Sequence, residues 1–103
     1  MSRIESLLKM LESEPKDVFL NYALAMEYFG QQKWEETKEQ LLNTQKLNND
    51  YLPCYYQLGQ VCEKLGKETE AIEYYKKGLE LAKKQSNNKA VNELNEAIWM
   101  LEE

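Results

Sequence analysis

Acidic side chains are the groups of this chain best supplied to do chemistry, since 18 Asp and Glu residues stand against 13 Lys and Arg. Carboxylates one helical turn apart could pair as general acid and general base. The chain has two such groups, Glu35, Glu36 and Glu39, then Glu68, Glu70 and Glu73. On amphipathic helices these positions fall on solvated faces, so we expect them to keep the surface hydrated rather than to catalyse a reaction.

Other catalytic and metal-binding groups are scarce. The 103 residues contain no His, the commonest general base and metal ligand. Cys54 and Cys62 alone cannot complete a zinc site, and on one helix they lie about 12 Å apart, too far for a disulfide. The 4 Gly residues are scattered, so no phosphate-binding loop is formed. We therefore predict no enzymatic activity, no cofactor and no metal, and we interpret both cysteines as small buried hydrophobes.

The net charge narrows the choice of partner. A formal charge of -5 repels a nucleic-acid backbone, so nucleic acid is not an expected partner. The basic residues of the second half read as a solvated helix face, namely Lys64, Lys67, Lys76, Lys77, Lys83, Lys84 and Lys89. The N-terminus, MSRIESLLKMLESE, lacks the features of a signal peptide, and no apolar run approaches the ~20 residues that cross a bilayer. We expect no membrane association and a cytoplasmic location.

The elements that must position any functional residue come from an internal repeat. Shifting the sequence by 34 residues aligns 18–51 with 52–85 without a gap. Leu24 then meets Leu58, Ala25 meets Gly59 and Tyr22 meets Tyr56, and further matches are Lys33 with Lys67, Glu36 with Glu70 and Leu47 with Leu81. A fixed period of this size is typical of stacked helix pairs, an all-α solenoid.

The second copy, YYQLGQVCEKLGKETEAIEYYKKGLEL, resembles the tetratricopeptide repeat family. The residues at the family's characteristic places are Tyr55, Leu58, Gly59, Gly66, Ala71, Tyr75 and Leu81. The first copy keeps the spacing but departs in residue type, with Asn21 for the first aromatic, Gln32 for the turn Gly, Thr37 for the small Ala, Leu41 for the second aromatic and Thr44 for a later small residue. The resemblance implies an α-solenoid of antiparallel helix pairs, a superhelix that binds other proteins.

Small and turn-forming residues support this architecture. Ala25 and Gly59 allow the two helices of a pair to approach closely, and Thr37 and Ala71 are expected to face them. Gly66 is placed to end a helix in a left-handed conformation, and Asp50 and Pro53 to begin the next one.

Amphipathic segments flank the two copies. Ile4, Leu7, Leu8 and Leu11 predict a leading helix over 2–13 with Ser2 as its N-cap. A last helix over 88–102 carries one apolar stripe, Ala90, Val91, Leu94, Ala97, Ile98 and Leu101. Leu94 follows Leu58 by 36 residues, so the turn before this capping helix is longer. About six helices result, forming a single domain over 1–103 with repeats at 18–51 and 52–85.

The resemblance also implies which residues meet a partner. In this family, places five, nine and twelve of each repeat lie on its first helix and project into the concave groove. Here these are Tyr22, Met26, Phe29, Tyr56, Gln60, Glu63, Asn92, Glu96 and Trp99. Aromatic rings at helical spacing are also ordinary core, so Tyr22, Phe29 and Tyr56 could instead be buried. The aromatic residues assigned to packing are Tyr28, Trp34, Tyr51, Tyr55, Tyr74 and Tyr75.

Two kinds of association remain open. The leading hypothesis is a module that binds a protein or peptide in the groove. The alternative is a homodimer formed through the capping helix, whose Trp99 and Met100 exceed what its docking stripe needs, so that one should point to the groove and the other to solvent or a partner. One branch of the family clamps a partner's C-terminal carboxylates with Lys, Asn and Arg; Tyr22, Met26, Tyr56, Gln57 and Asn92 at those places disfavour that role.

Overall fold

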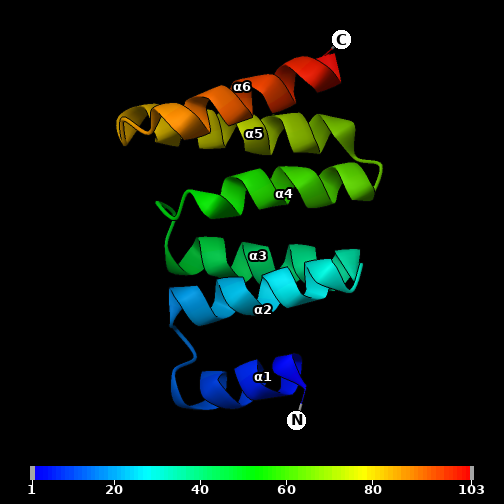
Figure 1. Ribbon diagram of the computed structural model, residues 1–103, viewed down its shortest axis with the longest axis vertical. Coiled ribbons are helices and arrows are strands. Elements are labelled where there is room, and N and C mark those ends of the chain that lie inside the picture. Colours follow the sequence, from blue (N-terminus) through cyan, green and yellow to red (C-terminus); the bar gives the residue numbers. More distant parts are fainter. Residues whose placement is uncertain (1, 103) are drawn as a thin grey trace. The chain divides into compact units, whose positions relative to one another are not determined.

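The computed structural model describes residues 2–102, and within them the chain is all α-helical, as the repeat predicts. Its helices are α1 (Arg3–Ser13), α2 (Val18–Gly30), α3 (Trp34–Leu47), α4 (Pro53–Lys64), α5 (Glu68–Lys84) and α6 (Asn88–Glu102). They group into two compact units, Met1–Asn49 with α1 to α3 and Asp50–Glu103 with α4 to α6. In each unit, successive helices run antiparallel (Figure 1). The single domain over 1–103 stays a prediction.

In the first unit, side chains stabilise the starts of the helices by hydrogen bonds to the backbone. Ser2 and Glu5 form a reciprocal capping box at the start of α1, which confirms the predicted N-cap. At the start of α2, Asp17 accepts a hydrogen bond from the Leu20 amide at 2.8 Å. These caps satisfy amide groups that a helix leaves without an internal partner.

A buried amide replaces the aromatic residue that the family places early in the first copy. The Asn21 side chain is 3% exposed and donates to the carbonyls of Pro15 (3.1 Å) and Asp17 (2.8 Å). Its oxygen accepts from Gln40 Nε2 at 2.7 Å and from Asn43 Nδ2 at 3.0 Å on α3. Asn21 therefore uses its full hydrogen-bonding capacity to join α2, α3 and the turn before α2.

Three helices end in the same hydrogen-bonded turn, the Schellman motif. After α4, the Gly66 amide donates to the Glu63 carbonyl and the Lys67 amide to the Cys62 carbonyl. Gly66 has φ +75°, the left-handed conformation predicted for it. Gln32 after α2 and Ser86 after α5 adopt φ 59° and 55° with the same pair of bonds, although neither is Gly. At the start of α4 the N-cap is Leu52 rather than Asp50, with Pro53 as the first helical residue.

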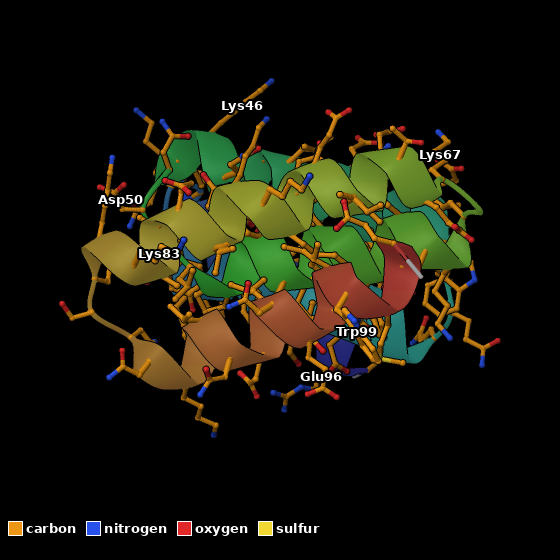
Figure 2. All side chains as sticks on the ribbon, turned by 90° about the horizontal axis from the view of Figure 1, so that it is seen from above. Lys46, Asp50, Lys67, Lys83, Glu96 and Trp99 are labelled. Atoms are coloured by element: carbon orange, nitrogen blue, oxygen red, sulfur yellow. The ribbon has the colours of Figure 1, made fainter. Side chains whose placement is uncertain are left out.

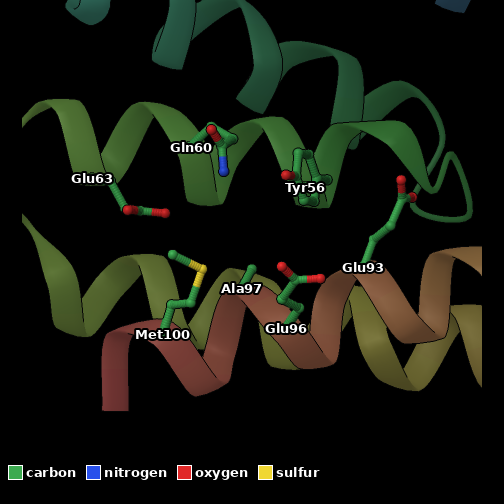
Figure 3. A pocket seen from close by; sticks show the side chains of 7 residues that line it. All are labelled: Tyr56, Gln60, Glu63, Glu93, Glu96, Ala97 and Met100. Carbon is green, nitrogen blue, oxygen red and sulfur yellow. The ribbon is translucent and has the colours of Figure 1, made fainter. Parts of the chain in front are cut away.

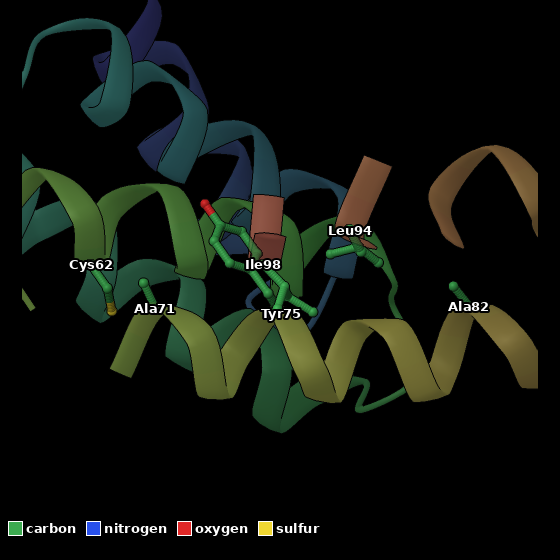
Figure 4. Packing of buried hydrophobic residues seen from close by; sticks show 6 residues of the cluster. All are labelled: Cys62, Ala71, Tyr75, Ala82, Leu94 and Ile98. Carbon is green, nitrogen blue, oxygen red and sulfur yellow. The ribbon is translucent and has the colours of Figure 1, made fainter. Parts of the chain in front are cut away.

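The core of the second unit forms around Tyr75 of α5. Tyr75, Cys62, Ala71 and Ala82 are fully buried, with Leu94 and Ile98 of α6 packed on the same cluster (Figure 4). A Cβ atom at Gly59 would overlap the Tyr75 ring, lying 2.5 Å from its Cδ1 and Cζ atoms. Gly59 is therefore required for close approach, as predicted, but the group opposite it is the Tyr75 ring and not Ala71. Both cysteines are buried and neither forms a disulfide, which agrees with the interpretation of Cys54 and Cys62 as buried hydrophobes.

Helix α5 explains the longer spacing before the last helix. A copy of α3 shifted by the repeat period would end at Leu81, whereas α5 continues to Lys84, so the extra residues lie in the helix and the predicted longer turn is wrong. Of the residues assigned to packing, Tyr55 and Tyr75 are buried, and Tyr28, Trp34, Tyr51 and Tyr74 are half-buried. Within residues 2–102, no helix has the length and apolar content needed to cross a bilayer.

Candidate functional site

A pocket of about 320 Å³ opens between α4 and α6 in the second unit (Figure 3). One wall consists of Tyr56, Gln60 and Glu63, spaced so that they share one face of α4. The other wall belongs to α6 and is made of Glu93, Glu96, Ala97 and Met100. The three α4 residues are the groove positions predicted for the second copy.

Tyr75 lies behind the α4 wall and contacts each of these three residues. Its hydroxyl accepts a hydrogen bond from Gln60 Nε2 at 2.7 Å and donates one to Glu63 Oε2. Its ring lies 5.8 Å from that of Tyr56, centroid to centroid, at a tilt of 48°. Because Gly59 has no side chain, the Tyr75 ring can reach this position across the helix pair. The buried ring thus orients the polar side chains of the wall.

Burial dominates the electrostatics of Tyr75. Desolvation raises the pKa of its phenol well above the ordinary range, and the adjacent Glu63 carboxylate raises that pKa further. The hydroxyl therefore stays protonated and keeps donating to Glu63. A neutral phenol held in this way fixes the carboxylate in place and is poorly suited to act as a base.

The sequence predicted only part of the α6 wall of the pocket. Of the three α6 residues that were predicted, Glu96 lines the pocket, whereas Asn92 and Trp99 do not. The other α6 residues that line it are Glu93, Ala97 and Met100. Leu94 and Ile98 are buried in the core as the shifted alignment requires. The buried positions of α6 thus agree with the alignment. The face of α6 that borders the pocket differs from the predicted one by a shift of one residue, a rotation of about 100° around the helix axis.

Met100 borders the pocket, whereas Trp99, the residue predicted to face the groove, does not. Each is 64% exposed, and Trp99 lies on the surface of α6 (Figure 2). The spacing of Glu93, Ala97 and Met100 at i, i+4 and i+7 repeats that of the α4 wall. The predicted Asn92, Glu96 and Trp99 have the same spacing, so spacing alone could not distinguish the two faces of α6.

The predicted groove residues of the first unit lie on α2. Tyr22, Met26 and Phe29 are all half-buried there. The Phe29 ring packs edge-on against Trp34 of α3, with centroids 5.2 Å apart and planes at 74°. Phe29 thus contributes to packing between the helices of this pair, and a role of these three residues in binding stays a prediction.

Comparisons with known proteins agree with this architecture. A tetratricopeptide repeat family model matches residues 52–85, the second copy. Anaphase-promoting complex subunit 3 of Dictyostelium discoideum is 30% identical over 84 residues, which are 82% of this chain but 9% of that protein. The chain therefore spans about a tenth of that relative's length.

Solved structures extend the similarity to nearly the whole chain. The solution structure of a tetratricopeptide repeat domain protein from Salinibacter ruber is 31% identical, with a TM-score of 0.80 over 85% of this chain and 89% of that one. The first such domain of Spaghetti (RPAP3), bound to the HSP90 peptide SRMEEVD, is 27% identical, with a TM-score of 0.78 over 97% of this chain and 78% of that one. With its helix pairs, its Gly59 to Tyr75 packing and these matches, the chain belongs to the tetratricopeptide repeat family.

Proposed function

We propose that this chain is a non-enzymatic interaction module that holds a peptide segment of a partner protein in the pocket between α4 and α6. The observation that carries the proposal is the convergence of Tyr56, Gln60 and Glu63 on one pocket, opposite the exposed thioether of Met100. Aromatic and Met side chains give large contact area, while the polar groups beside them supply hydrogen bonds. The Spaghetti domain bound to a peptide supports a binding role for a chain of this fold.

The composition of the pocket disfavours an acidic chaperone tail as the ligand. The peptide bound to Spaghetti ends in two Glu residues followed by Val and Asp. Here, three of the seven residues lining the pocket are Glu, and a second set of carboxylates would be repelled by them. We therefore propose this pocket as the binding site, but not an acidic chaperone tail as its ligand. A cytoplasmic location remains part of the proposal, supported by two buried cysteines that form no disulfide.

Truncation of the pocket aromatic tests the proposal. Tyr56→Ala should weaken capture of a partner peptide by about 1 kcal/mol or more, because the contact area of the ring is lost. Tyr74→Ala is the matched control, since Tyr74 is also half-buried against the core of this unit but does not line the pocket. Peptide binding by calorimetry and helicity by circular dichroism are measured for both. If the two variants bind the peptide equally well, Tyr56 does not contribute to the binding surface and the proposed pocket is wrong.

Self-association through α6 is the second candidate function. It is favoured by Trp99, which is 64% exposed although it is one of the largest apolar side chains in the chain. An exposed Trp on α6 can add its area to an isologous contact between two copies. This candidate predicts an association that grows with concentration and needs no peptide.

A further inference from the structure

The pocket between α4 and α6 brings together negative charge and apolar surface. Glu63 lies on one wall, and Glu93 and Glu96 lie on the other (Figure 3). Tyr56, Ala97 and Met100 supply the apolar surface between them. No Lys or Arg lines this pocket, so its ligand must meet at least three carboxylates.

The side chains that line the pocket offer these carboxylates no basic partner. Arg3 pairs with Glu27 at 3.1 Å and Lys76 with Glu102 at 3.4 Å, and neither of these two ion pairs involves the pocket. Glu63 has its orientation set by the Tyr75 hydroxyl, so one carboxylate is already held in place. A cationic ligand would lower the repulsion among the three, whereas an anionic ligand would add to it.

The spacing of the carboxylates argues for an organic cation. Within residues 2–102, no three acidic, Cys or His groups lie close enough to hold a metal ion. A guanidinium is broader, because it is planar and presents five N–H donors that can reach two carboxylates at once. It also stacks on aromatic faces, and its methylene chain packs on apolar side chains such as those of Tyr56 and Met100.

We propose that the pocket selects a peptide segment carrying an arginine side chain, with the guanidinium at Glu93 and Glu96 and the methylene chain against Tyr56 and Met100. This inference rests on the proposed function and adds the class of ligand. Charge complementarity chooses the occupant, since neither a neutral nor an acidic segment would pair with the carboxylates of the α6 wall.

Panning a phage-displayed library of random peptides on the purified full chain tests the inference. Enriched peptides should contain Arg far more often than the unselected library. One enriched peptide is then synthesised with Arg and with Gln at the selected position. The Gln form should bind about tenfold more weakly or worse, because it loses a charge-assisted hydrogen bond to a carboxylate.

Two double variants of the protein locate the charge effect. Glu93→Gln with Glu96→Gln should weaken binding of the Arg peptide by about tenfold, with a much smaller effect on the Gln peptide. Glu73→Gln with Glu80→Gln is the control, because it makes the same change of net charge at exposed positions of α5 outside the pocket. The control should bind both peptides as the original chain does.

The outcomes separate this inference from the proposed function. If peptides are enriched and lost with Tyr56→Ala but carry no excess of Arg, the pocket binds peptides and the arginine inference is wrong. If the two double variants weaken the Arg peptide equally, general charge is responsible and the inference is also wrong. If the original chain enriches no peptide, both proposals fail.

Discussion

At the scale of single residues, the contact between Gly59 and Tyr75 links packing to the pocket. The first copy has Ala25 and Leu41 at these places, and all four residues are buried. A methyl group on one helix is thus exchanged for a larger ring on the other, which conserves volume across the helix pair. Only the Gly and Tyr combination puts a hydroxyl within reach of Gln60 and Glu63.

We expect Gly59→Ala to lower the free energy of unfolding by about 1–3 kcal/mol, because the new methyl group overlaps a fully buried ring. Thermal and urea unfolding measure the change. Gly30→Ala is the control, since a Cβ at Gly30 meets nothing within 4 Å and Ala is the better helix former. The control should melt at or above the original temperature. A harmless Gly59→Ala would show that the two helices do not approach closely there.

Burial of Cys54 predicts a loss of stability in alkali. Desolvation raises the pKa of its thiol from 9.0 to about 12. Above pH 9.0 the thiol ionises in the unfolded chain but stays protonated in the folded one, so the unfolded state gains stability as the pH rises. The free energy of unfolding should therefore fall between these pH values, by up to about 1.4 kcal/mol per pH unit from this group.

Comparison of the original chain with Cys54→Val isolates that contribution. Tyr75, whose pKa is also raised by burial, adds to the alkaline loss in both proteins. The pKa of Tyr51 is raised by burial and also by Cys54, so its contribution is smaller in the variant, in the same direction as the expected effect. The difference in urea stability between about pH 8 and about pH 10 should be smaller in the variant. Equal pH slopes would mean that the Cys54 thiol ionises as readily in the folded chain as in the unfolded one.

At the scale of helices and turns, the three Schellman motifs differ in the residue that takes the left-handed conformation. Gly66 does so without steric cost, whereas the Cβ of Gln32 crowds the backbone at φ 59°. Gln32→Gly should raise the free energy of unfolding by up to about 1 kcal/mol, and Gly66→Gln should lower it by a similar amount. Chemical unfolding of both variants checks the pair. The opposite order would mean that the Gln32 side chain contributes more to stability than its backbone strain costs.

Spacing in the sequence was sufficient to predict most of these elements. Period, helical type and the left-handed turn at Gly66 all follow from residue types at fixed positions. The role of Asn21 does not, because its partners Gln40 and Asn43 lie on another helix and become neighbours only after folding. For the same reason, the sequence predicted that Gly59 must be small but not that Tyr75 fills the space.

The residues that line the pocket were likewise predicted only in part from the sequence. Tyr56, Gln60 and Glu63 were predictable because the second copy follows the family pattern closely. Glu93, Ala97 and Met100 were missed because positions were transferred from α4 to α6 as though both helices presented the same face. Two helices on either side of a groove must present different faces to each other, and the period alone does not specify that rotation.

At the scale of the whole molecule, the question is whether two copies associate. Trp99 is the side chain that can report on this association, since it lies outside the pocket and is 64% exposed. Its environment can be read without interference in Trp34→Phe, because the chain has only 2 Trp residues. In a dilute solution of that variant, we expect the emission of an indole in water and ready quenching by acrylamide.

Concentration then distinguishes self-association from peptide binding. If α6 forms a dimer, the Trp99 emission shifts to shorter wavelength as the concentration rises, with a matching increase in sedimentation coefficient. Trp99→Lys in the original chain should abolish that increase and leave the melting temperature nearly unchanged, since an exposed side chain contributes little to the core. A chain that stays monomeric at high concentration, with an exposed indole throughout, would exclude the dimer and leave the acidic pocket as the proposed binding surface. Because Met100 borders the pocket and neighbours Trp99, an Arg peptide that also dissociates the dimer would show that the two associations compete for α6.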